Sequence, residues 1–243
     1  MDKVTFDAEF IKFIKAVKSE FDINFQKKLN GIIGNSMIRG NNPSLSHIVE
    51  DKFAEFLFTF YSNKNYLYLI DVNLSTCFNG EGKSIRPDIV VLERESNEIK
   101  AIFELKIDDA RAEDDWVAMS QGRLDRLKKI SNKSELGEKG NYIHYNTIKV
   151  NDIGEPIKTP SGKYSTQRHS VRCSPDAKSA CITMCEENSR KIKDTKILRT
   201  SGDYAMYLSE KHFNNQNHSK ECILSDENLK ANELYELLLK MNL

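Results

Sequence analysis

The stretch RPDIVVLERESNEIKAIFELK, residues 86–106, contains the residues on which both the fold and the chemistry of this chain depend. Two runs rich in valine, isoleucine, leucine and phenylalanine, which are typical of strands, flank the short polar stretch RESNE. A polar connection of this length predicts an antiparallel hairpin. Asp88 begins the first strand, and Glu104 and Lys106, two residues apart on the second, project from one face. The hairpin therefore brings two carboxylates and an ammonium together in an otherwise apolar segment.

Packing alone does not account for these charges, because burying an unpaired charge costs several kcal/mol. A Glu–Lys pair on an exposed edge strand is the structural alternative. Two carboxylates are suitable ligands for a hard cation such as Mg²⁺, and the main-chain carbonyl of Leu105 could add a further oxygen. Lys106 would hold and polarise an attacking water or stabilise developing charge. This combination favours metal-assisted hydrolysis of a phosphodiester.

The same residues resemble the core of the PD-(D/E)XK nuclease superfamily, the fold of many type II restriction endonucleases. The resemblance implies an α/β fold with a central mixed β-sheet flanked by helices. It also implies that Asp88 and Glu104 bind Mg²⁺, for which Mn²⁺ can substitute, and that Lys106 is the catalytic lysine. The family usually adds an acid on the helix before the sheet, where Glu50 matches and Glu55 is the competing choice.

Three further residues are candidates for substrate binding. Gln121 matches a glutamine that many exonuclease-like members carry on the helix after the lysine strand. Asp125 stands where those members have a tyrosine, so only half of that motif is present and an ordinary surface glutamine is the alternative. Arg86, beside Asp88, could contact a phosphate or pair with an acid. Arg123 begins the basic half of the same helix.

The rest of the chain predicts a single nuclease domain over residues 1–243. Apolar residues at helical spacing predict helices, and β-branched and aromatic runs predict strands. Their order predicts an α/β or α+β domain with a central mixed sheet between helices. We expect residues 1–43 to form an N-terminal helix and loop, 44–130 the catalytic core, and 131–243 the rest of the core with DNA-recognition elements. The expected helices are 5–30, 44–62, 114–130 and 227–243; the expected strands are 66–75, 85–93, 99–107, 180–187 and 200–210; residues 131–172 form a long loop, a small insertion or a short hairpin.

The charge distribution is uneven although the formal net charge is zero. Residues 1–120 carry 15 Lys and Arg against 20 Asp and Glu, whereas residues 121–243 carry 21 against 16. An acidic half for a metal beside a basic half for phosphates is one interpretation, and an ordinary solvated surface is the other. The basic residues suited to phosphate contacts form three groups: Arg123, Arg126, Lys128 and Lys129; Lys163, Arg168, His169 and Arg172; Arg190, Lys191, Lys193, Lys196 and Arg199.

Several classes of protein are disfavoured by what the sequence lacks. It has no run of 18 apolar residues and no secretory signal, so we expect a cytoplasmic protein without membrane contact. No phosphate-binding loop occurs, and we expect no nucleotide cofactor. Five cysteines, an odd number, are expected to be reduced thiols. Cys181 and Cys185 resemble half of a zinc site, but no second pair is evident and we interpret them as small apolar residues of a strand.

The sequence thus predicts a metal-dependent endodeoxyribonuclease acting on double-stranded DNA, with a type II restriction endonuclease favoured. Cutting both strands normally requires two active sites, so we expect a homodimer. Nucleases of the same fold that resolve junctions, repair DNA or belong to mobile elements remain alternatives. An inactive DNA-binding protein with this fold, an RNA substrate, and a coincidental Pro-Asp and Glu-x-Lys pattern are the others.

Overall fold

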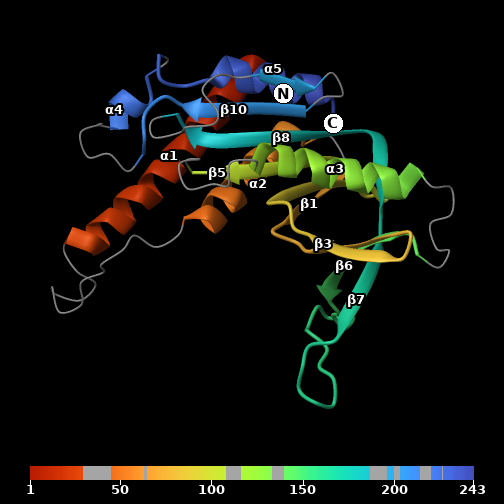
Figure 1. Cartoon of the computed structure of the whole chain (residues 1–243). Helices are drawn as coiled ribbons and strands as arrows, with labels where there is room; N and C mark the ends of the chain where they lie inside the picture. Colours follow the sequence, from red (N-terminus) through yellow and green to blue (C-terminus); the bar gives the residue numbers. More distant parts are fainter. Residues whose placement is uncertain are drawn as a thin grey trace.

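The computed structural model describes residues 1–29, 45–62, 65–107, 116–132, 140–186, 196–199, 203–213, 220–225 and 227–243. Its helices gather around a long twisted sheet, and a second, smaller sheet leads into a projecting ribbon (Figure 1). In chain order the elements are α1 (Lys3–Leu29), α2 (Ser46–Phe60), β1 (Tyr66–Ile70), β2 (Leu74–Phe78), β3 (Glu81–Ile85), β4 (Ile89–Glu93), β5 (Glu98–Lys106), α3 (Trp116–Asn132), β6 (Tyr142–Ile148), β7 (Thr166–Ser170), β8 (Arg172–Cys185), β9 (Lys196–Arg199), β10 (Asp203–Ser209), α4 (Lys220–Ile223) and α5 (Ala231–Met241).

The central sheet has the strand order β1-β4-β5-β8-β10-β9 and is mixed. β1, β4 and β5 are antiparallel neighbours, whereas β5, β8 and β10 run parallel and β9 closes the edge antiparallel. Parallel β5 and β8 need a crossover connection, and α3 forms part of it. The expectation of an α/β fold with a mixed sheet flanked by helices is confirmed. The predicted hairpin is confirmed as well, since β4 and β5 pair antiparallel from Ile89 opposite Phe103 to Glu93 opposite Glu98.

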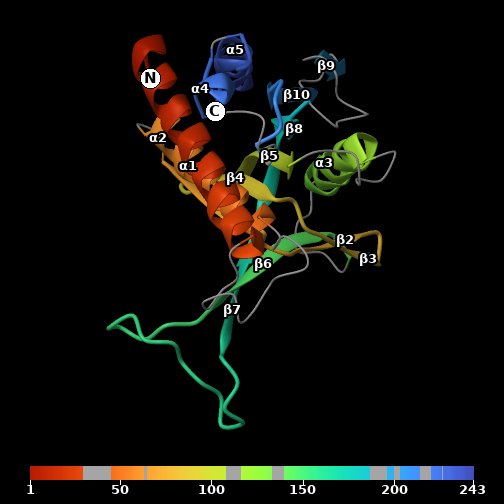
Figure 2. The same ribbon diagram turned by 90° about the vertical axis from the view of Figure 1, so that its left-hand side faces the viewer.

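The two faces of the central sheet are covered differently. Val91 and Phe103 face the core that contains α1, α2 and α5, while Val90 and Ile102 face α3 and the second sheet. Figure 2 shows α1 and α3 on opposite sides of the sheet. Because both faces are buried, β4 from Ile89 to Leu92 and the middle of β5 from Ala101 to Phe103 are continuously apolar rather than alternating. A polar group on either strand therefore requires a specific partner.

Two of the expected strands are each broken into two. The run 66–75 is interrupted at Asp71, whose φ of 52° turns the chain, so β1 joins the central sheet and β2 the second sheet. Of the run 85–93, only Ile85 belongs to β3, residues 86–88 lie outside the strands, and 89–93 form β4. The expectation of single strands was wrong here because the breaks depend on which sheet each half joins, and local composition does not encode that choice.

The second sheet has the order β3-β2-β6-β7, with all neighbours antiparallel. Within 131–172 the hairpin is the correct alternative, although it is longer than expected. We call residues 142–170 the arm. Beyond its stem, β6 and β7, it divides into a first finger, residues 150–156, and a second finger, residues 158–164, each closed by an isolated bridge. Figure 2 shows the two fingers diverging at the end of the arm.

The helices follow the apolar periodicity of the sequence. α1 buries Phe6, Phe10 and Ile14 on one face, and α2 buries Phe53 against Phe13 and Phe103. α5 is shorter than the expected 227–243. No helix in the described ranges is both long enough and apolar enough to span a membrane.

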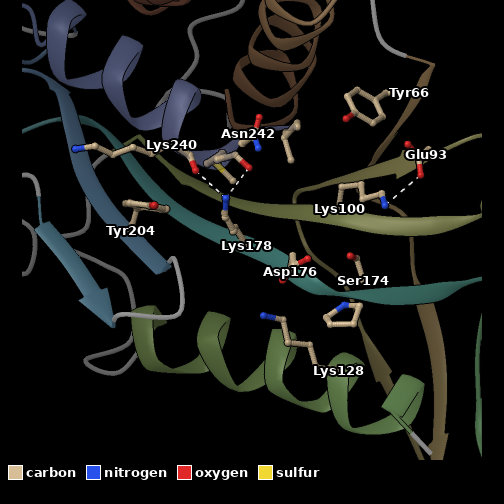
Figure 3. A pocket seen from close by; sticks show the side chains of 13 residues that line it. Tyr66, Glu93, Lys100, Lys128, Ser174, Asp176, Lys178, Tyr204, Lys240 and Asn242 are labelled. Atoms are coloured by element: carbon tan, nitrogen blue, oxygen red, sulfur yellow. Dashed lines mark hydrogen bonds and ion pairs between the residues drawn. The ribbon is translucent and has the colours of Figure 1, made fainter. Parts of the chain in front are cut away.

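A polar cavity of about 790 Å³ lies where α5 ends against the central sheet (Figure 3). Lys178 of β8 donates hydrogen bonds across it to the main-chain oxygens of Lys240 (2.7 Å) and Met241 (2.9 Å). These oxygens belong to the last turn of α5, which has no intrahelical donors for them. Lys178 therefore fixes the C-terminal end of the helix to the sheet.

The cysteines of β8 are buried, as the strand interpretation of Cys181 and Cys185 predicted. All five cysteines are free thiols. Burial raises the pKa of Cys181 to about 12, which keeps its thiol protonated and makes it a poor metal ligand at neutral pH.

Candidate active site

Asp88 lies immediately before β4 and is tied to β5 through its side chain. The last residue pair between the two strands is Ile89 with Phe103. Beyond it the Asp88 Oδ2 atom accepts a hydrogen bond from the main-chain N–H of Leu105 at 2.5 Å. The carboxylate thus takes the place of the next main-chain acceptor. The Nζ atom of Lys106 lies 3.8 Å from the same oxygen.

Glu104 and Lys106 project from the face of β5 that α3 covers. Arg123, from α3, forms an ion pair with Glu104, whose side chain is only 5% exposed. Lys106 is 34% exposed and lies over the ring of Trp116, at the start of α3, with 5.6 Å between Nζ and the ring centroid. Glu104 is therefore enclosed between sheet and helix, whereas Lys106 reaches solvent.

Two buried polar atoms flank Lys106. Thr183 is the neighbour of Lys106 on β8. The Oγ1 atom of Thr183 and the Nε1 atom of Trp116 find no hydrogen-bond partner within the described part of the chain. Buried polar groups of this kind are normally satisfied by ordered water. The region beside the lysine is thus polar on the sheet side as well as on the solvent side.

Glu50, on α2, is the upstream acid that faces this site. It is 8% exposed, and its pKa is raised to about 7, first by burial and then by the negative charges of Asp88 and Asp71. Glu55 instead points to solvent, where it pairs with Lys52 at 2.9 Å. Of the two candidates that the sequence left open, Glu50 is the one within electrostatic range of Asp88.

The pKa values of the other two acids are also raised. Burial is the largest cause for both, and for Glu104 the charge of Asp88 adds to it, bringing its pKa to about 7. Lys106 and Arg123 act in the opposite direction on both. Three acids therefore share a poorly hydrated region in which each disfavours the ionisation of the next.

Asp71 is a fourth acid that the sequence analysis missed. It follows β1, its N–H donates a hydrogen bond to the main-chain oxygen of Asp88 at 2.8 Å, and its charge raises the pKa of Glu50. Arg86 pairs with its carboxylate at 2.5 Å, so in the structure Arg86 has the acid partner that was one of its two interpretations. The available signal was an aspartate at the end of a buried strand, but the pairing of β1 with β4 is not visible in the sequence.

Gln121 lies on α3, half-buried and one residue beyond the buried Ser120. Within the described residues no hydrogen bond or ion pair joins it to Glu104, Lys106 or Asp88. On the same helix, Trp116 packs against Cys181 of β8 and Arg123 forms an ion pair with Glu104 of β5. The structure thus brings Arg123 to the site and leaves Gln121 beside it.

The donor set suits a hard cation in its chemistry. Asp88, Glu104 and the main-chain oxygen of Leu105 offer only oxygen ligands, and Mg²⁺ is usually held by one or two carboxylates together with water and substrate oxygens. Among the described residues, no three His, Cys, Asp or Glu side chains converge as a complete metal cage. Glu104 is held by Arg123, and the Leu105 oxygen accepts a hydrogen bond from Lys106 Nζ at 3.2 Å.

The three basic groups do not form one surface. Arg126 binds the second sheet, donating to Thr76 Oγ1 at 3.0 Å and to the main-chain oxygen of Glu81 at 2.8 Å. Lys128 lines the cavity of Figure 3, at the opposite end of the strands from Asp88. The group Lys163, Arg168, His169 and Arg172 lies on the arm and at the start of β8. Arg190, Lys191 and Lys193 lie outside the described residues, as do the side chains of Lys196 and Arg199.

No protein-family model matches this chain, and no curated protein and no solved structure is detectably similar to it.

Proposed function

We propose that this chain is a metal-dependent endodeoxyribonuclease of the PD-(D/E)XK type, which hydrolyses phosphodiester bonds of double-stranded DNA with Mg²⁺, or Mn²⁺ in its place. The observation that carries the proposal is the meeting of Asp88, Glu104 and Lys106 at the junction of β4 and β5, with Glu50 within electrostatic range of Asp88. The mixed sheet with flanking helices supports a restriction-endonuclease-like core.

The raised pKa values of the acids support a cation as the missing partner. Burying several carboxylates together is unfavourable unless positive charge offsets them, and Lys106 and Arg123 do so only in part. Asp88, Glu104 and the Leu105 oxygen would hold Mg²⁺. When bound, the ion supplies neutralisation of phosphate charge and a water that ionises more readily.

The chain's own residues would do the rest. Lys106 Nζ, half-exposed beside Asp88, orients the attacking water and stabilises charge that develops on the phosphate. Glu50 would provide a third carboxylate for orienting the attacking water. Were Glu104 to serve as a metal ligand, Arg123 would be available to contact a phosphate oxygen as a bidentate donor.

A type II restriction endonuclease is the role we favour, acting as a homodimer that presents two sites to the two strands. The same chemistry fits a nuclease that resolves junctions, repairs DNA or belongs to a mobile element. These roles differ in substrate rather than in active site, so the form of the products discriminates between them.

The test is cleavage of supercoiled plasmid by the purified chain with Mg²⁺, with EDTA, and with the variants Lys106→Ala and Glu104→Gln. We expect cutting that disappears with EDTA and falls by at least about 100-fold in both variants, the range expected when a general acid or base or an electrostatic stabiliser is lost. Matched controls are Lys52→Ala and Glu55→Gln, which change an exposed ammonium and an exposed acid on α2.

Discrete fragments would support a site-specific enzyme, and a smear lost in the same controls would support a nuclease of low specificity. Failure to cut plasmid, branched DNA and RNA with either Mg²⁺ or Mn²⁺ would overturn the proposal. If DNA were nevertheless bound, the inactive DNA-binding alternative would replace it.

A further inference from the structure

The arm has no hydrophobic core beyond its base. Ile143 and Tyr145 anchor it in the core beneath the second sheet, but every residue from Asn146 to Pro156 is exposed. Apolar side chains project from it into solvent: Val150 is 53%, Tyr164 53% and Ile153 78% exposed. A ribbon that buries so little of itself contributes little to folding stability, which favours a role in contact with another molecule.

The fingers are nevertheless well-defined turns. In the first, the side-chain oxygen of Asn151 accepts hydrogen bonds from the N–H groups of Ile153 (3.1 Å) and Glu155 (2.8 Å). In the second, the N–H of Thr159 donates to the Lys163 oxygen at 2.7 Å, and Gly162 has a φ of 80°, which residues with a side chain rarely adopt. The side chains at the tips are therefore presented in a fixed arrangement.

The two fingers differ in charge. The first contains Asp152 and Glu155 and no Lys or Arg. Residues 156–175, which include the second finger and β7, contain no Asp or Glu and four cations. Within the described ranges no carboxylate forms an ion pair with any of these cations. They are Lys158, Lys163, Arg168 and Arg172, all exposed.

The stem also presents side chains that suit a nucleic-acid groove. Asn146 and Arg168 are directly opposite each other on one face, with Ile148 opposite Thr166 beside them, and all four are exposed. A two-stranded ribbon fits the major groove of B-form DNA, where Asn pairs with adenine, Arg with guanine, and apolar groups contact the thymine methyl. On the other face, His169 stacks on Tyr145 and binds Thr147 Oγ1 at 2.8 Å, which holds β7 to β6.

The arm belongs to the sheet that begins at the active site. β6 pairs with β2, and the first pair of the β2–β3 hairpin is Leu74 with Ile85. The chain leads from Leu74 back to Asp71 and from Ile85 on to Asp88. Arg126 of α3 ties β2 and β3 to the helix that carries Arg123. A molecule bound along the arm is thus held by the same framework as Glu104 and Lys106.

We propose that the arm is the DNA-docking element of this nuclease, with the Asn146–Arg168 face entering the major groove and the second finger contacting phosphates. The inference rests on the proposed function for its partner and adds the surface that recognises it. The acidic first finger is repelled by phosphates and so points away from the backbone, which gives the arm one orientation on the duplex.

The test compares binding of a fluorescently labelled pool of random duplexes in Mg²⁺ by anisotropy, with every variant made on a Lys106→Ala background so that the DNA stays intact. The arm variant combines Lys158→Ser, Lys163→Ser and Arg168→Ser. Its matched control combines Lys12→Ser, Lys15→Ser and Lys240→Ser, which removes the same charge from exposed sites on α1 and α5. Circular dichroism checks that both variants keep the fold of the parent.

We expect the arm variant to lose on the order of 10-fold or more in affinity and to lower the slope of log K against log salt by about 1 for each lost phosphate contact. The control variant should bind like its parent. Equal effects in the two variants, or none in either, would overturn the inference.

Two further results separate it from its alternatives. If the wild type cuts plasmid, the three arm substitutions made in the wild-type sequence leave that cutting unchanged, and the arm variant binds like its Lys106→Ala parent, only the arm inference fails. If the wild type neither cuts nor binds any DNA, the proposed function fails first. If sedimentation velocity without DNA shows that the arm variant turns a dimer into a monomer, the arm pairs with a second copy of the chain instead.

Discussion

Arg123 contributes both to the charge balance of the site in the structure and to the chemistry proposed for it. The pKa of Glu104 is about 7: burial and Asp88 raise it, and the Arg123 guanidinium, through a hydrogen bond and its charge, partly offsets them. The pairing spans 19 residues of sequence and two different elements. It could not be predicted from the spacing of Asp88, Glu104 and Lys106, which identified only the residues on one hairpin.

Replacing Arg123 with Gln should move the pH dependence of cleavage. A protonated Glu104 could not hold the proposed cation, so the proposed activity should rise as pH increases through the pKa of Glu104. Without Arg123 that pKa is higher, and the rising limb of the profile should shift upward from near pH 7. Rates measured between pH 6 and 9 check this, with Arg126→Gln as a control on the same helix. An unshifted limb with lower rates throughout would indicate that Arg123 acts only on the substrate.

Glu50 gives a stability test that does not depend on activity. Its pKa in the folded state is about 7 against an ordinary 4.5, so the folded state binds the proton more tightly than the unfolded state. The free energy of unfolding therefore falls as pH rises from about 4.5 to about 7. Glu50→Gln removes this loss and should raise Tm at pH 8 by about 2–4 °C, as expected for about 1 kcal/mol, with little gain at pH 5. The control Glu55→Gln should leave Tm unchanged at both pH values. If Glu50→Gln raised Tm equally at pH 5 and pH 8, that result would contradict the electrostatic explanation.

At the scale of elements, the helices and strands defined by neighbouring residues were predicted better than those that depend on pairing between distant segments. The apolar spacing of α1 and α2 and the hairpin of β4 and β5 were predicted because neighbouring residues define them. Apart from Ile85, β3 was not predicted, since residues 81–84 are exposed, without an apolar pattern, and form a strand by pairing with β2. The turn at Asp71, which sends the chain to another sheet, has the same cause. Asp71 was missed as a site residue because of that error.

One prediction concerns the C-terminal end of α5, which Lys178 holds against the sheet. Its ammonium binds two main-chain oxygens at the helix C-terminus, where positive charge is favourable and hydrogen bonds to charged groups are strong. Lys178→Met should lower the free energy of unfolding by about 1–3 kcal/mol in urea titrations. Lys128→Met, which removes a second ammonium from the same cavity (Figure 3), should leave it nearly unchanged. Equal losses would mean that the charge of the cavity matters rather than the helix end.

At the scale of the whole molecule, the acidic and basic halves of the sequence are not separate lobes. β8, from the second half, lies between β5 and β10 in the centre of the sheet, and Arg123 reaches back to Glu104. The interpretation of the charge asymmetry as a metal half beside a phosphate half was therefore too coarse. Within the described ranges, four exposed cations that form no ion pair, Lys158, Lys163, Arg168 and Arg172, lie on the arm and at the start of β8.

The stability of the whole molecule should depend on the proposed cation. A ligand that binds only the folded state stabilises it by about 2.7 kcal/mol at 100 times its Kd. Mg²⁺ should then raise Tm by several degrees at pH 8, whereas KCl of equal ionic strength should not. Glu104→Gln should abolish the increase, because it removes a ligand from the site. The same rise in wild type and variant would place the binding of Mg²⁺ elsewhere on the protein.

The hydrogen bond from Leu105 to Asp88 has a consequence for how inactive forms of the protein should be made. A slip of one residue between β4 and β5 would turn Glu104 and Lys106 toward the aromatic core and Leu105 outward. The Asp88 side chain accepts the N–H of Leu105 in the observed register, so this hydrogen bond favours the register that keeps Glu104 and Lys106 out of the aromatic core. Asparagine retains an acceptor at that position and alanine does not. Asp88→Asn is therefore the substitution that removes the charge while preserving the alignment of the hairpin, and Asp88→Ala would confuse loss of chemistry with loss of structure.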